Sequence, residues 1–373
     1  MAACLHVIDP ASAGDAALWS AASLLRRDDS ARAAVIGSSD DARRALRWGL
    51  GRVDAIAAPL GRAELAWPTL RRLCRERTPR VVHAWSARAM VAAALAVRGM
   101  DTALVASLPA APCGGPLGAW SARIARGRAD ALLFDSERAA RAWGLLEEGV
   151  VAPAAPAEPG ALPAAGRAEA RAGWRASPGD AVIAVLTEPG SPLEAASASF
   201  LLGILTLAGR GVVGVAPSAH NLERAERFVQ RLGRRWAFTV DPRPLPEWLG
   251  ACDAAIWRQG RGGAASTPGF AARWALALGV PLIVEGDAAG LPAGAAWEVR
   301  PGHNQAAGAL LAVLEGRAAA RVSAMREAGL RHAREADPEE WAARIFRIHA
   351  RALGLAASGR LTARGSAPAQ ALR

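Results

Sequence analysis

The sequence predicts an α/β protein made of two Rossmann-like open domains, each with a largely parallel sheet, facing a cleft. Short apolar runs alternate with amphipathic stretches of about 10 to 15 residues, which is the pattern of βαβ units. A proline-rich segment at 151–166 interrupts this alternation, and the alternation restarts after it. A chain of 373 residues has room for two domains with separate cores.

The first half predicts a domain over residues 1–160. Its apolar runs indicate strands, and the amphipathic stretches between them indicate helices. The strands are expected at 4–8, 33–36, 53–57, 81–84, 103–107 and 131–134, and the helices at 15–27, 39–48, 63–76 and 87–97, with another after 134.

The second half predicts a domain over residues 161–336, followed by a helix at 337–354 and a disordered tail at 355–373. The strands are expected at 181–186, 212–216, 236–240, 254–257 and 281–284, and the helices at 193–208, 221–232, 245–251, 268–278 and 305–314. The last helix starts at Asp337 and Pro338, a suitable N-cap and first position. Its apolar stripe has no partner nearby in sequence, so it is expected to pack back on the N-terminal domain.

Charge and composition exclude several functions. The net charge is +11, and all 45 basic residues are arginine. The excess is spread along the chain instead of forming one basic stripe, so nucleic acid is not expected as a partner. Without lysine the chain cannot form a Schiff base or a P-loop.

Metal sites and membrane spans are not expected either. The four cysteines are far apart, with no CxxC pair, and there is no DxD motif, so buried thiols and metal-independent chemistry are predicted. No leader-like segment and no apolar run near 18 residues occurs. These features favour a cytoplasmic protein and leave peripheral contact with the inner face of the membrane open.

The glycine-rich segments differ in what they indicate. A GxGxxG pattern at 209–214 follows a predicted helix and enters a strand, which is the reverse of a dinucleotide fingerprint, so it predicts a helix end and turn. The loop after strand 254–257 is more informative, because arginines and glycines there precede a capped helix start. This loop can hold an anion such as phosphate, although a solvated turn with ordinary capping is the alternative. The residues concerned are Arg258, Arg261, Gly262, Gly263, Ser266 and Thr267.

Several segments, in order, resemble the nucleotide-sugar-dependent glycosyltransferases of the GT-B fold, family 4 type. The first looks like their opening strand and glycine loop, which contains Gly14, and the last like their terminal helix. The segments are LHVIDPASAGDAA at 5–17, PRVVHAWSARA at 79–89, ADALLFDSERAARAWG at 129–144, PLPEWLGACDAAI at 244–256, ALALGVPLIVEGDAAGLP at 275–292, VRPGHNQAAGALLAVLEG at 299–316 and WAARIFRIHARAL at 341–353.

The chain departs from the family at its donor site. Two glutamates that hold the donor's sugar and ribose hydroxyls in the family correspond to Ser266 and Trp274. The family's basic residues on the loop after the first strand of the second domain are missing from 186–197, and its histidine after the strand near 105 is also absent. Arg258 and Arg261, with the helix start at Thr267, are candidates to replace the lost cations.

The resemblance implies transfer of a sugar from a nucleotide sugar, which is a substrate and not a bound cofactor, to a glycan, lipid or small-molecule acceptor. On the acceptor side, His83 is a candidate base at a strand end facing the cleft, and Ser86 and Arg88 are candidate acceptor-binding residues. A strand-end histidine satisfied by the backbone is the simpler reading. The alternative function is a non-catalytic GT-B scaffold or binding protein. The oligomeric state is not indicated.

Overall fold

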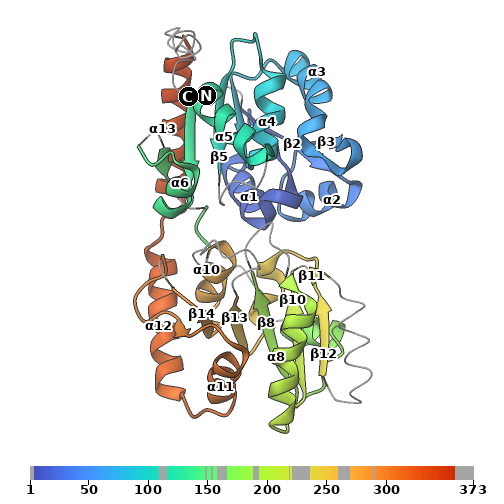
Figure 1. Cartoon of the computed structure of the whole chain (residues 1–373), viewed down its shortest axis with the longest axis vertical. Coiled ribbons are helices and arrows are strands. Elements are labelled where there is room, and N and C mark those ends of the chain that lie inside the picture. The colour runs from blue at the N-terminus through green and yellow to red at the C-terminus, as the bar shows by residue number, and fades with distance from the viewer. Residues whose placement is uncertain are drawn as a thin grey trace. The chain divides into compact units, whose positions relative to one another are not determined.

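A computed structural model describes most of the chain. The described residues are 4–108, 116–147, 149–152, 154–157, 166–187, 193–217, 219–220, 236–258, 269–288 and 290–357. The chain forms two compact units (Figure 1). Unit 1 consists of Met1–Ala155 together with Pro338–Arg373, and unit 2 consists of Pro156–Asp337. The C-terminal segment therefore belongs to the same unit as the N-terminus.

Unit 1 is built on a sheet whose seven strands, counted over the described residues, all pair in parallel in the order β3-β2-β1-β4-β5-β6-β7. Six of the strands coincide closely with the apolar runs of the sequence, and β7 was not predicted. The strands are β1 (Cys4–Ile8), β2 (Arg32–Gly37), β3 (Val53–Ala57), β4 (Val81–Ala84), β5 (Ala103–Ser107), β6 (Ala131–Phe134) and β7 (Gly149–Val151).

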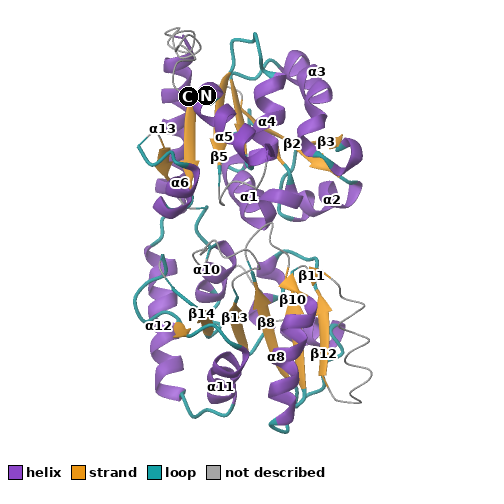
Figure 2. Ribbon diagram, in the orientation of Figure 1, coloured by secondary structure: helices purple, strands orange, loops and turns teal. Residues whose placement is uncertain are grey.

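The helices of unit 1 cover its sheet (Figure 2). They are α1 (Pro10–Leu25), α2 (Ser39–Arg47), α3 (Trp67–Arg77), α4 (Ala87–Ala96), α5 (Pro116–Arg128), α6 (Glu137–Trp143) and α13 (Pro338–Ala357), with the 3₁₀ turns η1 (Pro59–Gly61) and η2 (Ala63–Ala66). An apolar core lies between the sheet and α3, α4, α5 and α6. Helix α4 is almost entirely buried because it is rich in alanine, which lets it lie close to its neighbours.

Helix α13 packs against β5, β6 and α1 of this unit. Ile345 and Ile348 are buried at the contact, whereas Trp341 is only partly buried. At the helix start Arg27 Nε donates to Glu339 Oε1 at 2.9 Å, and farther along Arg344 donates to the Val151 carbonyl oxygen at 2.9 Å. The predicted tail at 355–373 lies almost wholly outside the described residues, because α13 is described only to Ala357.

Unit 2 repeats the plan of unit 1. Its described strands form a six-stranded parallel sheet in the order β12-β10-β8-β13-β14-β15, beside the short pair β9 (Leu193–Glu194) and β11 (Ala219–His220). The strands of the main sheet are β8 (Ala181–Leu186), β10 (Val212–Ala216), β12 (Trp236–Val240), β13 (Ala254–Trp257), β14 (Leu282–Glu285) and β15 (Trp297–Val299). The GxGxxG segment forms the turn before β10 and most of that strand, as predicted, and Gly209 in the turn has φ 84°.

The helices of unit 2 differ from the sequence prediction in three places. The stretch 245–251, predicted as one helix, forms the 3₁₀ turns η3 (Leu245–Glu247) and η4 (Leu249–Ala251). Helices α7 (Gly166–Gly173) and α12 (Ala319–Glu335) were not predicted. The predicted helix at 221–232 lies outside the described residues. The described helices are α7 (Gly166–Gly173), α8 (Ala195–Leu207), α10 (Phe270–Ala277), α11 (His303–Leu314) and α12 (Ala319–Glu335).

Both sheets have the doubly wound strand order. The first three strands of each main sheet follow one another toward one edge, and the strands from the fourth onward follow one another toward the opposite edge. The reversal lies between β1 and β4 in unit 1 and between β8 and β13 in unit 2. In open parallel sheets, ligands bind outside the carboxyl ends of the strands at such a reversal. The predicted fold class of two Rossmann-like parallel-sheet domains is therefore confirmed, and each unit has one expected ligand position.

Candidate functional site

In unit 2, the residue that follows β13 stands at the point of strand reversal. The backbone N–H of Arg258 donates to the Leu186 carbonyl oxygen at 2.9 Å, which extends the pairing of β13 with β8 by one residue. The Arg258 side chain therefore begins at the carboxyl edge of the sheet, where a ligand is expected.

Arg258 forms a buried ion pair with the last residue of the next strand. Its Nε donates to Glu285 Oε2 at 2.7 Å and its Nη2 to Glu285 Oε1 at 3.3 Å. Its Nη1 also donates to the Ser197 carbonyl oxygen in α8 at 3.1 Å. Arg258 is 7% exposed and Glu285 is 5% exposed, so both charges are held away from water. This geometry fixes the guanidinium in one orientation.

Arg258 was predicted to begin a glycine-rich loop, and the structure instead buries it at the end of β13. Backbone pairing with β8 keeps it in the sheet, and Glu285 compensates its charge. Glu285 was not predicted as a site residue. The available signal was a carboxylate ending the apolar run of β14, since a buried charge needs a partner. That Arg258 contacts a donor diphosphate stays a prediction.

A histidine lies beside this ion pair. Ser197 Oγ and His303 Nε2, at the start of α11, are 3.2 Å apart, and the Phe200 ring meets the His303 ring edge-on with centroids 4.9 Å apart. Burial, and then the positive charge of Arg258, lower the pKa of His303 below its usual value. His303 is therefore neutral at pH 7 and has one ring nitrogen that donates and one that accepts. His303 was not predicted as a site residue.

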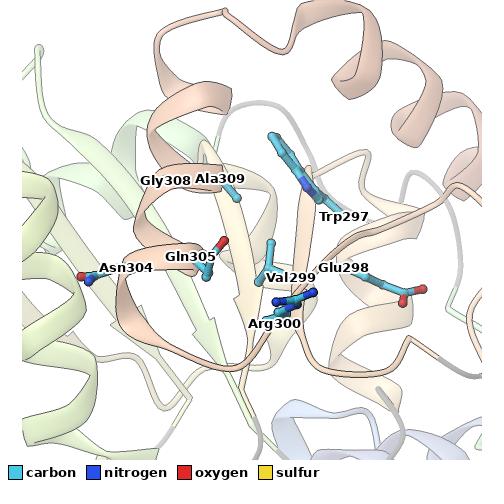
Figure 3. Close-up of a pocket in the computed structure, with 8 residues that line it drawn as sticks. All are labelled: Trp297, Glu298, Val299, Arg300, Asn304, Gln305, Gly308 and Ala309. Atoms are coloured by element: carbon cyan, nitrogen blue, oxygen red, sulfur yellow. The ribbon is translucent and has the colours of Figure 1, made fainter.

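A depression of about 560 Å³ is lined by residues that precede and follow His303 in the sequence. Figure 3 shows these lining side chains. Four of these residues come from β15 and the residue after it, and four from α11. They are Trp297, Glu298, Val299, Arg300, Asn304, Gln305, Gly308 and Ala309. The Arg321 guanidinium lies 4.2 Å from the centroid of the Trp297 ring. Ring, amide and charged groups together suit a polar ligand with a flat or apolar part.

The rest of the predicted anion loop cannot be placed. Arg261, Gly262, Gly263, Ser266 and Thr267 all lie outside the described residues. Trp274, at the second glutamate position of the family, is fully buried in α10, with its ring edge-on to Phe270. Its side chain packs in the core.

In unit 1, Gly14 lies near the carboxyl end of β1, inside α1. Its backbone has φ 64° and ψ −164°, which interrupts the helix after one turn. A residue with a Cβ adopts this conformation only at a cost, so glycine is required there. Asp9, just after β1, is 3% exposed and accepts a hydrogen bond from Ser12 Oγ at 2.6 Å. Burial raises the pKa of Asp9, while Ser12 and the charge of Arg88 oppose that rise.

His83 is the centre of a buried hydrogen-bonded chain. Its Nε2 lies 2.8 Å from Ser107 Oγ at the end of β5, and its Nδ1 lies 3.0 Å from His349 Nε2 in α13. The ring stacks on Trp85 with centroids 4.1 Å apart, and Trp85 Nε1 donates to His6 Nδ1 at 3.1 Å. The chain thus joins residues that are 266 positions apart in sequence.

The environment of these histidines keeps them neutral. His83 is 0% exposed, and burial, followed by the charges of His349 and His6, holds its pKa well below the usual value. Burial likewise lowers the pKa of His349 to about 4, although Asp28 opposes the shift. His83 was predicted at a strand end facing the cleft, and the structure instead buries its side chain completely. Its position inside β4, beneath α13, explains the difference.

Ser107 connects His83 to a small cavity of unit 1. The cavity has a volume of about 20 Å³, enough for one water molecule. Its lining includes the polar residues Ser20, Ser107 and Asp135, together with Trp85, Trp341 and Ile345. If His83 Nδ1 carries the proton shared with His349, its Nε2 accepts from Ser107, and the Ser107 oxygen is then free to accept from a ligand in the cavity.

Ser86 and Arg88 occupy the start of α4, next to the carboxyl end of β4. Ser86 is 3% exposed, and its Oγ accepts from Ala89 N at 3.0 Å, so it caps the helix. Arg88 is half-buried, and its charge opposes the rise in the pKa of Asp9. Against the effect of burial, the pKa of Glu64 is lowered by a backbone hydrogen bond, by its hydrogen bond from Arg62 and by the charge of Arg88. Ser86 and Arg88 are near the reversal point of unit 1, and their roles toward an acceptor stay predictions.

The described part of the chain contains neither a metal-binding cluster nor a helix that could span a membrane. No group of three or more His, Cys, Asp or Glu side chains there is arranged to hold a metal ion. None of the described helices is both long and apolar enough to cross a membrane. Of the four cysteines, Cys4, Cys74 and Cys252 are free and buried, and Cys113 lies outside the described residues.

Comparison by sequence identifies no relatives: no protein-family model and no curated protein matches this chain. Comparison by structure identifies similar proteins. Alr3699/HepE of Anabaena, in complex with UDP and glucose, is 14% identical with a TM-score of 0.73, over 93% of this chain and 99% of that one. A glycosyltransferase of Rickettsia africae is 10% identical with a TM-score of 0.67, over 94% and 98% of the two chains.

A different activity occurs among the similar structures. A putative UDP-N-acetylglucosamine 2-epimerase of Listeria monocytogenes is 11% identical with a TM-score of 0.61, over 99% of both chains. Identities this low establish the fold alone. The match to family 4 in particular stays a prediction. The chain has the two-domain GT-B fold of the glycosyltransferases that it resembles in structure.

Proposed function

We propose that this protein transfers a glycosyl group from a UDP-sugar to an acceptor hydroxyl. The observation that carries the proposal is the fold match to Alr3699/HepE, which extends over nearly the whole of both chains and includes complexes with UDP, with UDP and glucose, and with UDP-glucose. Fold likeness alone does not fix an activity, so the residues at the two reversal points provide the chemical argument.

On the donor side, the proposal assigns the diphosphate to the carboxyl edge of unit 2. Among the described residues, Arg258 uses three of its five N–H groups on Glu285 and Ser197, and the proposal assigns the other two to an incoming oxygen. Glu285 acts as a positioning residue that holds the guanidinium still. Departing UDP gains negative charge, and fixed N–H donors stabilise such charge without having to reorganise.

His303 and the loop beyond Arg258 complete the proposed donor site. Neutral His303 can donate to a phosphate or sugar oxygen, and it lies beside the depression lined by Trp297 and Gln305. Arg261, Gly262, Gly263, Ser266 and Thr267 are proposed to cover the diphosphate.

On the acceptor side, the proposal assigns His83 a role through Ser107. Transfer forms a bond between the acceptor oxygen and the anomeric carbon, breaks the bond from that carbon to UDP, and releases the acceptor proton. A water molecule held in the cavity beside Ser107 would take this proton and pass one of its own to Ser107 Oγ, and Ser107 would pass its proton to His83 Nε2. His83 can then shift the proton at its Nδ1 to His349, where Asp28 favours positive charge. Gly14, Ser86 and Arg88 are proposed to line the rest of this side.

The proposal also includes the acceptor class, the metal independence and the location that the sequence predicts. The acceptor is expected to be a glycan, a lipid or a small molecule, the reaction is expected not to require a divalent metal, and a cytoplasmic location with peripheral membrane contact stays a prediction.

A non-catalytic GT-B binding protein is the second candidate. The observation that favours it is the ion pair itself, because Glu285 already compensates the charge that Arg258 would offer to a diphosphate.

Calorimetry with UDP, UDP-glucose, ADP and GDP, combined with an assay for UDP release, tests the proposal. We expect saturable binding of UDP and UDP-glucose at one site per chain, and slow UDP release with water as the acceptor. His303→Gln should weaken binding, whereas His332→Gln on α12 should not. Ser107→Ala should leave UDP binding unchanged and slow turnover. Binding without turnover by the wild type would favour the non-catalytic candidate.

A further inference from the structure

A second polar depression lies at the opposite end of the unit 2 sheet. It has a volume of about 730 Å³ and is lined where the strands begin: Ala181 starts β8, Asp253 precedes β13, and Pro281 precedes β14. Arg258 and Glu285 lie at the other ends of the same strands. This depression, called here the amino-end pocket, is therefore separate from the proposed donor site.

Four arginines from three parts of the chain line the amino-end pocket. Arg167 and Arg171 come from α7, Arg210 from the turn before β10, and Arg326 from α12. The only carboxylates among its described lining residues are Asp180 and Asp253. Two positive charges are therefore left uncompensated in the lining.

Asp253 is fully engaged with one pair of these arginines. Its Oδ1 accepts from Arg167 Nη2 at 2.7 Å, and its Oδ2 accepts from Arg171 Nη1 at 3.1 Å and from the Val182 N–H at 2.8 Å. Arg171 also donates to the backbone carbonyl oxygens of Ala251 and Asp180. These contacts fix two sides of the pocket, and they leave Asp253 little capacity to compensate a further cation.

The other two arginines have N–H groups without a hydrogen-bond partner among the described residues. Arg210 is half-buried and makes no hydrogen bond or ion pair with any described residue. Arg326 donates only its Nε, to the Gly279 carbonyl oxygen at 3.0 Å, so its two terminal amino groups have no partner among the described residues. Asp180 accepts from the Ser177 N–H at 2.7 Å and forms no described ion pair with either arginine.

We propose that the amino-end pocket is a binding site for a phosphate-bearing anion, held chiefly by Arg210 and Arg326. A guanidinium offers parallel N–H donors that match two oxygens of a phosphate, and such charge-assisted bonds are stronger than neutral ones. The pocket volume falls within the usual range for small-molecule sites. The proposal does not depend on glycosyl transfer, since it concerns the other end of the sheet.

Gly179 allows this charge requirement to be tested without changing the shape of the pocket. It lines the pocket, a Cβ added to it would meet no atom within 4 Å, and its φ lies outside the positive range. Gly179→Asp therefore places a carboxylate among the arginines, whereas Gly179→Asn places a neutral side chain of the same size there. A difference between these two variants reports charge alone.

Calorimetry of the full chain with inorganic pyrophosphate and with phosphate, in the presence of saturating UDP, is the experiment. We expect pyrophosphate to bind, and Arg210→Gln and Arg326→Gln each to weaken binding about 10-fold or more, since a hydrogen bond to a charged group contributes at least about 1.5 kcal/mol. Gly179→Asp should abolish binding and Gly179→Asn should preserve it. Arg334→Gln, on the exposed surface of α12, is the control.

A second arm distinguishes a free anion from a lipid headgroup. Sedimentation with vesicles of anionic phospholipid should give the same order of variants if the phosphate belongs to a membrane lipid. Melting curves check that each variant is folded. Absence of binding in both arms, or binding that Gly179→Asp and Arg210→Gln leave unchanged, overturns the proposal.

Discussion

Arg258 Nε donates to Glu285 Oε2 at 2.7 Å, and this contact joins the ends of two neighbouring strands at the reversal point of unit 2. Both side chains are buried, and the guanidinium also holds the backbone of α8 through Ser197. The pair therefore links three elements around the position where the fold is expected to bind its ligand.

Replacing one partner of this ion pair should lower the free energy of unfolding more than replacing both partners. Glu285→Gln leaves a buried guanidinium without its counter-charge, which typically costs about 3–5 kcal/mol, whereas replacing both partners by apolar residues is often neutral. We expect Glu285→Gln to lower the free energy of unfolding by that amount, and Arg258→Met with Glu285→Met to lower it by much less. Urea denaturation measures both. Equal losses in the single and double variants would contradict the pairing.

The buried histidines of unit 1 should make the fold sensitive to acid. Burial lowers the pKa of His6 to about 3 and that of His349 to about 4, below the usual value of about 6.5. The unfolded chain therefore binds more protons than the folded one below pH 6.5. Stability is fully present above that pH and is lost as the pH falls toward the folded pKa values.

His349→Gln should accordingly flatten the dependence of unfolding free energy on pH between about 6.5 and 4. The more exposed His332 provides a comparison, since His332→Gln should change the slope less. Urea titrations at several pH values in this window give the slopes. The account fails if His349→Gln leaves the slope of the wild type unchanged.

Gly14 should resist substitution because of its backbone conformation. Its φ of 64° and ψ of −164° belong to a region that residues with a Cβ avoid, at a cost of about 1–3 kcal/mol. Gly14→Ala should lower the melting temperature accordingly. Gly51→Ala is a matched control in the same unit, since its added Cβ meets no atom and its φ is not positive. Similar melting temperatures for the two variants would refute the assignment of strain.

Helix α13 should contribute strongly to the stability of unit 1 through its apolar face. Ile345 is 2% exposed against the N-terminal part of the chain, and truncating a buried isoleucine to alanine typically costs about 2–5 kcal/mol. The exposed pair of Arg27 and Glu339 should contribute about 1 kcal/mol or less. Chemical denaturation of Ile345→Ala and Glu339→Gln compares the two contributions, and the reverse order would count against the observed packing.

Much of the fold could be predicted because its signals are local. The run at 254–257 is apolar throughout and forms β13 with the same bounds. Helix α12 was missed although Met325, Gly329 and Ala333 recur every four residues and are buried. Gly329 stands where a large apolar side chain is usual in such a stripe, which makes the helix pattern hard to recognise. A Cβ added at Gly329 would lie only 3.0 Å from Leu276 Cβ, so glycine is needed there because α12 packs closely on α10.

The candidate sites could be predicted only in part because their contacts join distant segments. Arg258 was selected from its loop, but its partner Glu285 is 27 residues away and becomes its neighbour only through the order of the strands. His83 was selected, while Ser107 and His349 depend on β5 lying beside β4 and on the return of α13 to unit 1. Neither arrangement can be predicted from the spacing of residues along the sequence.

Binding and turnover of UDP-glucose by the full chain is the measurement that tests the central claim most directly. The account predicts one saturable site for UDP-glucose, competition by UDP, and release of UDP that slows in Ser107→Ala without loss of binding. A folded protein that binds neither UDP nor UDP-glucose would contradict the assignment of unit 2 as a donor-binding domain.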